Sequence, residues 1–222
     1  MEYEFQFHYI LQAWPVLMEG LKVTVQLTVI ANIIALTLGF VIALLVLSKY
    51  WLLRAPFALM IELFRCTPVL VQILWFFYCV PILFGIYLAP LPMGILALGI
   101  NLACFNAEAY RAAIQAVPRE QLDAGVALGF SPLQRVRHVV FPHAFRAALP
   151  VLITNGITLF QQSALVAIVA LSDLMYMGRQ VATQSYRPIE TYTAVALIYF
   201  AISFPVSRVA AWVEHRLDAA RA

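Results

Sequence analysis

The side chains in this sequence that could do chemistry are amides and hydroxyls embedded in long apolar runs. The charge-free segment from Ala147 to Ser172 carries the largest group of candidates: Asn155, Thr158, Gln161, Gln162 and Ser163. A second charge-free segment, from Cys66 to Ala107, carries Asn101. Because polar groups are costly in hydrocarbon, each of these is a candidate for contact with a polar solute. Hydrogen bonding between neighbouring helices is the alternative.

Helical spacing would gather these candidates on common faces. Asn101 and Glu108 lie seven residues apart, which places them on one face of a helix. Asn155 and Gln162 have the same spacing in a later helix, with Thr158 on the same face. We expect the two faces to line a pathway in which a solute exchanges water for amide and hydroxyl partners.

Two pairs of opposite charges lie three residues apart, Glu62 with Arg65 and Glu108 with Arg111. Side chains at this spacing are neighbours on a helix surface and commonly form ion pairs. Both pairs are therefore expected to be structural.

Signals of enzymatic catalysis and of metal binding are missing. The only lysines, Lys22 and Lys49, do not follow a glycine-rich phosphate loop. The histidines at positions 8, 138, 143 and 215 have no partner at the spacing of a helical zinc site. We expect no catalytic residue, no metal and no cofactor, so uphill movement of a solute would need an ion gradient or another subunit.

The composition is that of a membrane protein. Only 11% of the 222 residues are charged, against about 25% in soluble domains, and the mean hydropathy is +0.88. A helix of about 20 apolar residues crosses a bilayer. Prolines at 81, 90 and 92 divide the longest charge-free run into a helical hairpin. We predict an all-α membrane protein with about five transmembrane helices: 21–47, 67–87, 91–111, 147–172 and 191–212.

The positive charges indicate the orientation of these spans. Of the 14 Lys and Arg residues, 11 fall on one side of the predicted membrane and three on the other. The positive-inside rule then places the N-terminus outside and the C-terminus in the cytoplasm. The first 20 residues are expected to form an interfacial segment rather than a cleaved signal, and residues 51–68 a short helix at the cytoplasmic surface. The net charge of +3 is an orientation signal, so no nucleic acid is expected as a partner.

The largest polar segment lies between the third and fourth spans, at 117–142. Pro118 suits the start of a helix, and Gly129 can end that helix with a positive φ. Ser131 can cap a second helix and Gln134 can return a capping-box bond. Pro142 is expected to end this second helix.

Three interpretations of this helix pair compete. It could pack passively on the bilayer surface, or it could be a helix-turn-helix that reads DNA. The second is disfavoured because a short fragment tethered between two spans has no core of its own. An apolar face rimmed by arginines is typical of a protein interface, which favours a docking platform for a cytoplasmic partner.

The helix pair resembles the "EAA" coupling loop of ABC-transporter permeases. Asp123-Ala124-Gly125 stands where that pattern has Glu-Ala-Ala, and Gly129 follows at the spacing of the pattern. Val139 to Pro142 stands where the pattern has Ile-x-Leu-Pro. The resemblance implies that the loop inserts into a cleft of a cytoplasmic ATPase dimer. The candidate coupling residues are Asp123, Ala124, Gly125, Gly129, Ser131, Pro132, Arg135 and Pro142.

More closely, the chain resembles permease subunits of polar amino-acid importers over about residues 15–217, the expected transmembrane domain. The segment "RCTPVLVQ" is similar to their Arg-Gly-Thr-Pro motif, with Cys66 in place of the glycine, and Ala107, Glu108 and Arg111 fit their Ala-Glu-x-x-Arg motif. Residues 156–168 look most like glutamate/aspartate permeases.

The resemblance implies a multi-pass protein of the bacterial inner membrane that is not itself an enzyme. The implied partners are an ATPase dimer that hydrolyses ATP, a second permease subunit, identical or related, and an extracytoplasmic amino-acid-binding protein. Membrane lipid would surround the spans. The main alternative is a self-sufficient secondary transporter or channel, although the internal repeat typical of such proteins is missing. A membrane anchor without transport is a further alternative.

Overall fold

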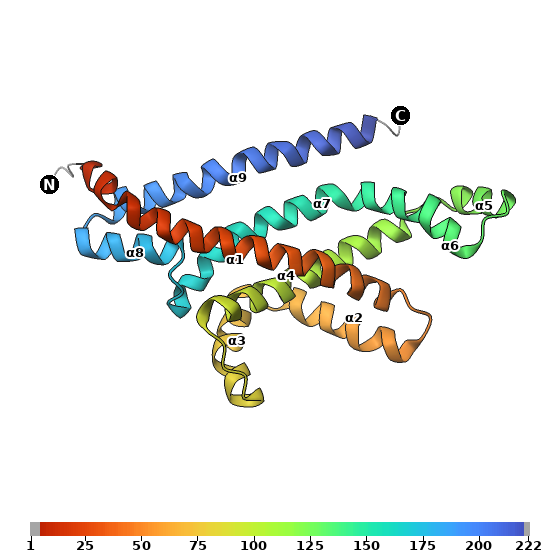
Figure 1. The fold of residues 1–222 in the computed structure, drawn as a ribbon, viewed down its shortest axis with the longest axis horizontal. Helices are drawn as coiled ribbons and strands as arrows, with labels where there is room; N and C mark the ends of the chain where they lie inside the picture. Colours follow the sequence, from red (N-terminus) through yellow and green to blue (C-terminus); the bar gives the residue numbers. More distant parts are fainter. Residues whose placement is uncertain (1–4, 220–222) are drawn as a thin grey trace.

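The computed structural model describes residues 5–219, and helices without any strand make up the secondary structure of this part of the chain. Arg221, one of the 14 Lys and Arg residues counted above, and residues 1–4 of the expected interfacial segment lie outside the described residues. Four long helices run along the long axis of the molecule (Figure 1): α1 (His8–Val46), α4 (Pro90–Gln115), α7 (Phe141–Gln162) and α9 (Pro188–Ala219). Each of the four is long and apolar enough to cross a membrane.

A fifth candidate span consists of two helices joined at a sharp bend. Helix α2 (Trp51–Cys66) and helix α3 (Val69–Phe84) are bent by 112° relative to each other, and only together do they pass as a membrane-crossing segment. At a rise of 1.5 Å per residue, α3 alone is about 24 Å long, which is shorter than the hydrocarbon core. The prediction of about five spans is confirmed with this bent pair counted as one, and α3 lies within the span predicted at 67–87 but is shorter at both ends.

The helix of the first span begins earlier than predicted. Helix α1 is continuous from His8, so the prediction of a separate interfacial segment before residue 21 is wrong. The extra turns have tertiary partners, because Leu17 is fully buried and Gly20 lies against the backbone of Asp173. Packing against another element thus extends a helix that local sequence would allow to stop.

Helix α2 forms over the residues expected for an interfacial helix, but it packs along α1 and α4 instead of standing apart from the bundle. Its Ile61 is buried in the main hydrophobic core, which α1, α3, α4 and the segment after α7 complete. That segment is a 3-10 helix, η2 (Ser163–Val169), so the span predicted at 147–172 is α7 from Phe141 followed by η2.

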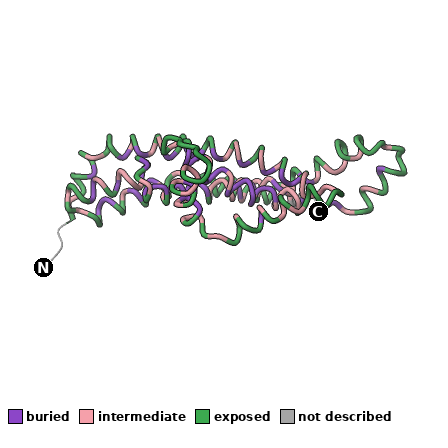
Figure 2. The backbone as a smooth tube through the Cα atoms, turned by 90° about the horizontal axis from the view of Figure 1, so that it is seen from below, coloured by how far each residue is buried: buried purple, intermediate pink, exposed green. Residues whose placement is uncertain are grey.

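A second, smaller core lies at the end of the molecule near the N-terminus. There Leu17 of α1, Leu174 of α8 (Leu174–Ser185) and Val195 of α9 pack together. Helix α8 occupies most of the segment between the spans predicted at 147–172 and 191–212. Figure 2 shows buried positions concentrated where the long helices overlap and exposed positions on the loop that projects at the opposite end.

The projecting loop contains α5 (Arg119–Ala127), α6 (Pro132–Arg135) and a π-helical turn, η1 (Val136–Val140), which runs directly into α7. The prediction that Pro142 ends the second helix is therefore wrong. The amide of Phe141 donates to the carbonyl of Val136, five residues back. Such a widened turn makes room for the proline ring, which would clash with the preceding carbonyl in a regular α-helix.

Candidate functional site: a coupling loop and a polar pathway

The turn between α5 and α6 depends on Gly129. Its φ is +74°, a left-handed conformation that side chains disfavour. The amide of Gly129 donates to the carbonyl of Val126 at 2.9 Å, and the amide of Phe130 donates to the carbonyl of Gly125 at 3.0 Å. These two bonds are the Schellman arrangement that ends a helix, as predicted for this glycine. A Cβ at Gly129 would meet nothing within 4 Å, so the constraint at this position is conformational.

Ser131 then starts the next helix with a complete capping box. The amide of Ser131 donates to Oε1 of Gln134 at 2.8 Å, and the amide of Gln134 donates to Oγ of Ser131 at 3.4 Å. Pro132 occupies the first turn, where its missing N–H is tolerated. The two helices lie close together, since a Cβ added at Gly125 would be only 3.3 Å from Cγ of Arg135. The absence of a side chain at Gly125 allows this close approach. The predicted capping box is therefore confirmed.

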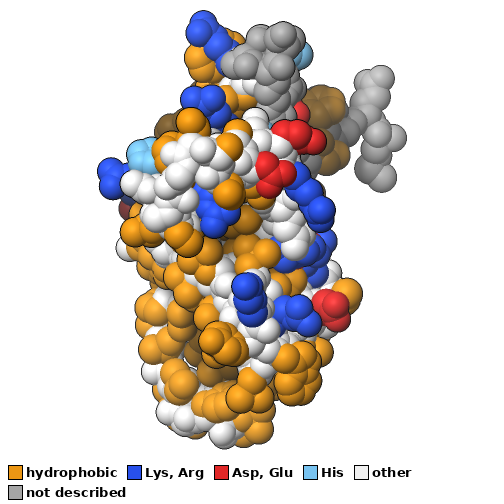
Figure 3. All heavy atoms as spheres, turned by 90° about the vertical axis from the view of Figure 1, so that its right-hand side faces the viewer, with side chains coloured by type: hydrophobic (Ala, Val, Ile, Leu, Met, Phe, Trp, Pro, Cys, Tyr) orange, Lys and Arg blue, Asp and Glu red, His pale blue; other side chains and the backbone are white. Residues whose placement is uncertain are grey.

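The loop presents an apolar surface without a partner in the described chain. Val126, Leu128, Leu133 and Val136 are each more than half exposed, and Asp123 and Ala124 are exposed as well. Beside them a groove of about 610 Å³ runs from α5 past His138 and Arg146 to Leu217 at the end of α9. Figure 3 views this end of the molecule and shows Lys and Arg side chains gathered on it.

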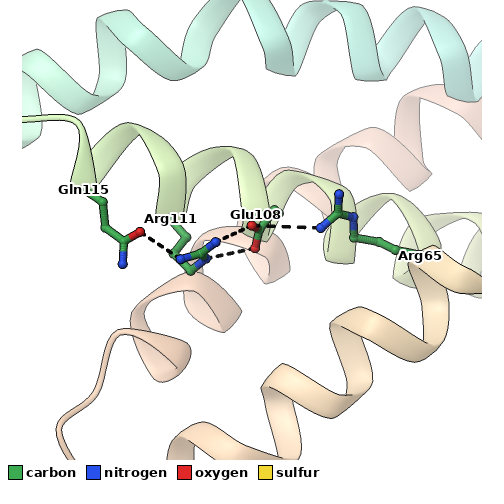
Figure 4. Close-up of polar contacts among 4 residues, drawn as sticks. All are labelled: Arg65, Glu108, Arg111 and Gln115. Atoms are coloured by element: carbon green, nitrogen blue, oxygen red, sulfur yellow. Dashed lines mark hydrogen bonds and ion pairs between the residues drawn. The ribbon is translucent and has the colours of Figure 1, made fainter.

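A row of ion pairs links α4 to α2 near the same end (Figure 4). Glu108 forms an ion pair with Arg111, whose Nε donates to Oε2 at 2.9 Å, and Arg111 also donates to Gln115 at 2.8 Å. Arg65 of α2 lies 3.9 Å from Oε1 of the same glutamate. The predicted pair of Glu62 with Arg65 does not form among the described residues, because the guanidinium of Arg65 turns across to α4 instead of along its own helix.

Asn101 lies in the core and faces the α2–α3 break. Its Nδ2 donates to Oε1 of Gln72 at 2.8 Å, and Gln72 in turn donates to the carbonyl of Phe64 at 2.8 Å. Asn101 is 3% exposed and Gln72 is 7% exposed. The face of α4 that was expected to line a pathway at Asn101 and Glu108 is therefore in contact with α2 and α3.

The polar residues of α7 are placed differently from one another. Asn155 donates from Nδ2 to Oδ1 of Asn106 on α4 at 3.0 Å. Thr158 is exposed and bonds to the carbonyl of Thr154 in its own helix. At the end of α7, Gln161 is exposed, Gln162 is half-buried and Ser163 is fully buried, with its hydroxyl donating to the carbonyl of Phe160 at 2.7 Å. The structure does not bring Asn101 into hydrogen-bond contact with this group.

Almost all of the described chain matches one known family. The family described as "Binding-protein-dependent transport system inner membrane component" matches residues 8–219. The chain belongs to this family. It is a multi-pass permease of the inner membrane.

Relatives of the permease carry amino acids. It is 32% identical to the L-cystine transport system permease protein TcyB of Bacillus subtilis over 206 residues, which are 92% of this chain and 88% of the relative. It is 30% identical to the glutamate/aspartate import permease protein GltK of Escherichia coli over 225 residues, which cover 96% of this chain and 99% of the relative. A solved amino acid ABC transporter superimposes with a TM-score of 0.90 at 31% identity, covering 96% of this chain and 100% of that one.

The permease is thus a subunit of an amino-acid ABC importer, a class that works with a cytoplasmic ATPase and a substrate-binding protein. Hydrolysis of ATP takes place in that separate ATPase subunit. Family membership gives no support to the alternative of a self-sufficient secondary transporter.

Several polar residues of the permease were missed by sequence reasoning. A cavity of about 570 Å³ lies between α1, α7 and α9, and Asn32 and Ser203 contribute polar groups to its mostly apolar wall. Asn32 lies so close to α7 that a Cβ at Gly156 would be 2.9 Å from its Oδ1. Asn106 is buried in α4. The signal that flagged Asn101, an amide in an apolar run, also applies to Asn32 and Asn106.

Asp173 is a further residue that the sequence analysis passed over. It caps α8, where its carboxylate accepts from the amides of Tyr176 at 2.9 Å and Met175 at 3.3 Å. It lies between the spanning segments and is fully buried. Burial raises the pKa of Asp173 to about 6, although the amide donors and the nearby Arg179 act in the opposite direction. The carboxyl group therefore titrates close to neutral pH.

Proposed function

We propose that this permease forms the translocation pathway of an ATP-driven importer for polar amino acids and receives the motion of the ATPase at residues 117–142. The observation that carries the coupling role is the glycine-joined helix pair, which projects from the bundle and exposes an apolar surface at Leu128 and Leu133. A protein partner that covers such a surface would remove it from water. Residues 15–217 would form one transmembrane domain with the loop inside it.

The proposed contacts with the ATPase follow from the shape of the loop. Gly129 and Ser131 fix the turn, and Gly125 lets α5 approach Arg135 closely. Asp123 and Ala124 are exposed on α5, where an ATPase cleft could contact them. Pro132 starts the second helix and Pro142 marks where the loop joins α7, so a push on the loop would move that spanning helix directly.

For the substrate we propose glutamate or aspartate within the class of polar amino acids. Support comes from the likeness of residues 156–168 to glutamate/aspartate permeases and from the 30% identity to GltK. Cystine and arginine are the comparison substrates, because their permeases in Bacillus subtilis are 32% and 30% identical to this chain. Amides and hydroxyls along the pathway would take over hydrogen bonds from water. The proposed contacts are Asn155, Thr158, Gln161, Gln162 and Ser163; Asn101 is not among them, because it is buried and bonded to Gln72.

The proposed assembly contains two permease subunits, identical or related, and an ATPase dimer on the cytoplasmic side. The N-terminus would lie outside and the C-terminus in the cytoplasm, as the distribution of Lys and Arg indicates. An amino-acid-binding protein would dock on the outer side, where α8 carries Arg179.

The test is ATP-dependent uptake by the complete complex in liposomes, with the binding protein on the substrate side. Gly129→Asp should abolish uptake and co-purification of the ATPase, because it forces a charged side chain into a left-handed turn at the interface. Gly85→Asp is the matched control, since Gly85 also has a positive φ, +66°, and open space around it, but lies outside the loop. Uptake without ATP, or normal uptake by Gly129→Asp, would contradict the proposal.

A further inference from the structure

The break between α2 and α3 leaves the carbonyls in the last turn of α2 without their regular partners, and that of Phe64 is one of them. In a continuous helix the carbonyl of Phe64 would accept from the amide of residue 68. Residue 68 is a proline, which has no N–H to donate. A carbonyl that faces buried side chains such as Asn101 is costly to leave unpaired, because water does not replace the lost bond there. The broken arrangement therefore needs another donor for Phe64.

Gln72 supplies that donor from the first turn of α3. Its Nε2 lies 2.8 Å from the carbonyl of Phe64, 3.0 Å from the carbonyl of Thr67 and 2.6 Å from Oγ1 of Thr67. Three oxygens around one terminal atom identify it as the amide nitrogen. The side chain thus reaches back across the break and binds the open end of α2.

Asn101 of α4 orients this amide through a hydrogen bond to its oxygen. Its Nδ2 donates to Oε1 of Gln72 at 2.8 Å and lies 3.5 Å from the carbonyl of Phe64. One and two turns further along the same face, Phe105 lies under the guanidinium of Arg65, at 5.7 Å, and Glu108 pairs with that guanidinium. This face of α4 therefore contacts the last turn of α2 at two neighbouring residues, Phe64 and Arg65.

The direction of α3 matters because α3 packs on η2, directly after the polar end of α7. Ile73 of α3 and Val166 of η2 belong to the same buried cluster. On this basis we propose that Gln72, oriented by Asn101, is a positioning residue that fixes the α2–α3 break and with it the wall of the pathway beside Gln162 and Ser163. The functional part of this inference rests on the proposed transport activity, whereas the structural part does not.

The experiment measures the bend directly. Spin labels at Leu59 and Ile82, which are 66% and 80% exposed, report the separation of the two helices in a chain whose three cysteines are replaced by alanine. A straight helix would place these positions about 35 Å apart, and the 112° bend brings them to roughly 20 Å. Labelled chains are diluted with unlabelled ones in the complete complex, so that distances within one chain dominate.

Gln72→Met keeps the length of the side chain and removes its donors. We expect the ratio of chains with the short distance to chains with longer distances to fall by about tenfold or more. We also expect uptake per assembled complex to fall further than ATP hydrolysis does. Gln26→Met makes the same exchange on the exposed surface of α1 and should leave the distances and uptake unchanged.

Unchanged distances in Gln72→Met would overturn the inference, whatever happens to transport. If this variant does not assemble, Asn101→Leu decides the question, because it leaves the donors of Gln72 in place and removes the group that orients them. A broadened short distance in Asn101→Leu supports the positioning role, and an unchanged one overturns it. Loss of ATP-dependent uptake in the parent chain would instead refute the proposed function and leave the distance result standing.

Discussion

Asn155 of α7 donates a hydrogen bond of 3.0 Å to Asn106 of α4, so that two amides join the helices on either side of the coupling loop. Asn106 is only 1% exposed, and its own Nδ2 has no partner within the described residues. Because α4 leads into the loop and α7 leads out of it, a rigid link at this point would make the two helices move together.

We predict that Asn155→Leu lowers the stability of the permease by about 1 kcal/mol, since hydrogen bonds between membrane helices contribute roughly 0.6–2 kcal/mol. The single and double variants with Asn106→Leu should be non-additive, because either change removes the same bond. Thermal unfolding in detergent measures the effect. Thr154→Val, which removes a bond within α7 only, is the control. Additive losses would show that the two amides act independently.

The contact between α1 and α4 gives a second prediction, because two of its glycines differ in the space around them. A Cβ at Gly39 would lie 2.8 Å from the carbonyl of Ala103, a backbone atom that cannot move aside easily. A Cβ at Gly99 would lie 3.5 Å from the carbonyl of Ala31, an ordinary contact distance. We expect Gly39→Ala to destabilise the permease by about 2 kcal/mol and Gly99→Ala to leave it nearly unchanged. Equal unfolding midpoints for the two variants would contradict the close packing at Gly39.

The row of ion pairs predicts that Glu62 and Glu108, the two glutamates near Arg65, differ in how much they stabilise the permease. Glu108→Gln removes both ion pairs and should destabilise the permease by about 1 kcal/mol, a modest value because the side chains are partly exposed. Glu62→Gln should have no measurable effect. The difference between the variants should shrink in high salt, because salt screens exposed charges. Thermal unfolding at low and high salt checks both statements, and a larger loss in Glu62→Gln would reverse the assignment.

The turn chemistry of the coupling loop could be predicted from the sequence because it is local. Gly129 ends a helix by its own conformational freedom, and Ser131 with Gln134 forms a capping box between residues three apart. Pro142 was misjudged by the same local logic, since a π-helical turn lets the helix pass through it. A rule about one residue cannot show that the preceding turn will widen.

The partners of buried and charged groups could not be predicted in the same way. Arg65 had an acidic neighbour on its own helix, and only the packing of α2 on α4 shows that it turns to Glu108 instead. Asn101 stands out in the sequence as an amide in an apolar run, but its bond to Gln72 depends on a helix break that composition does not reveal. Spacing identifies which residues need a partner, and tertiary packing determines which partner they find.

The last prediction concerns the pH dependence of stability at Asp173. Burial raises the pKa of this carboxyl group from 3.8 to about 6 in the folded chain. The folded state therefore binds a proton more tightly than the unfolded state, and the free energy of unfolding falls as the pH rises from about 4 to 6. This rise in the pKa corresponds to a change of roughly 3 kcal/mol in the free energy of unfolding. Asp173→Asn keeps a capping side chain but cannot titrate. Its unfolding midpoint should match that of the parent near pH 4 and exceed it at pH 7. Parallel pH profiles for the two chains would show that Asp173 does not cause the loss of stability between these pH values.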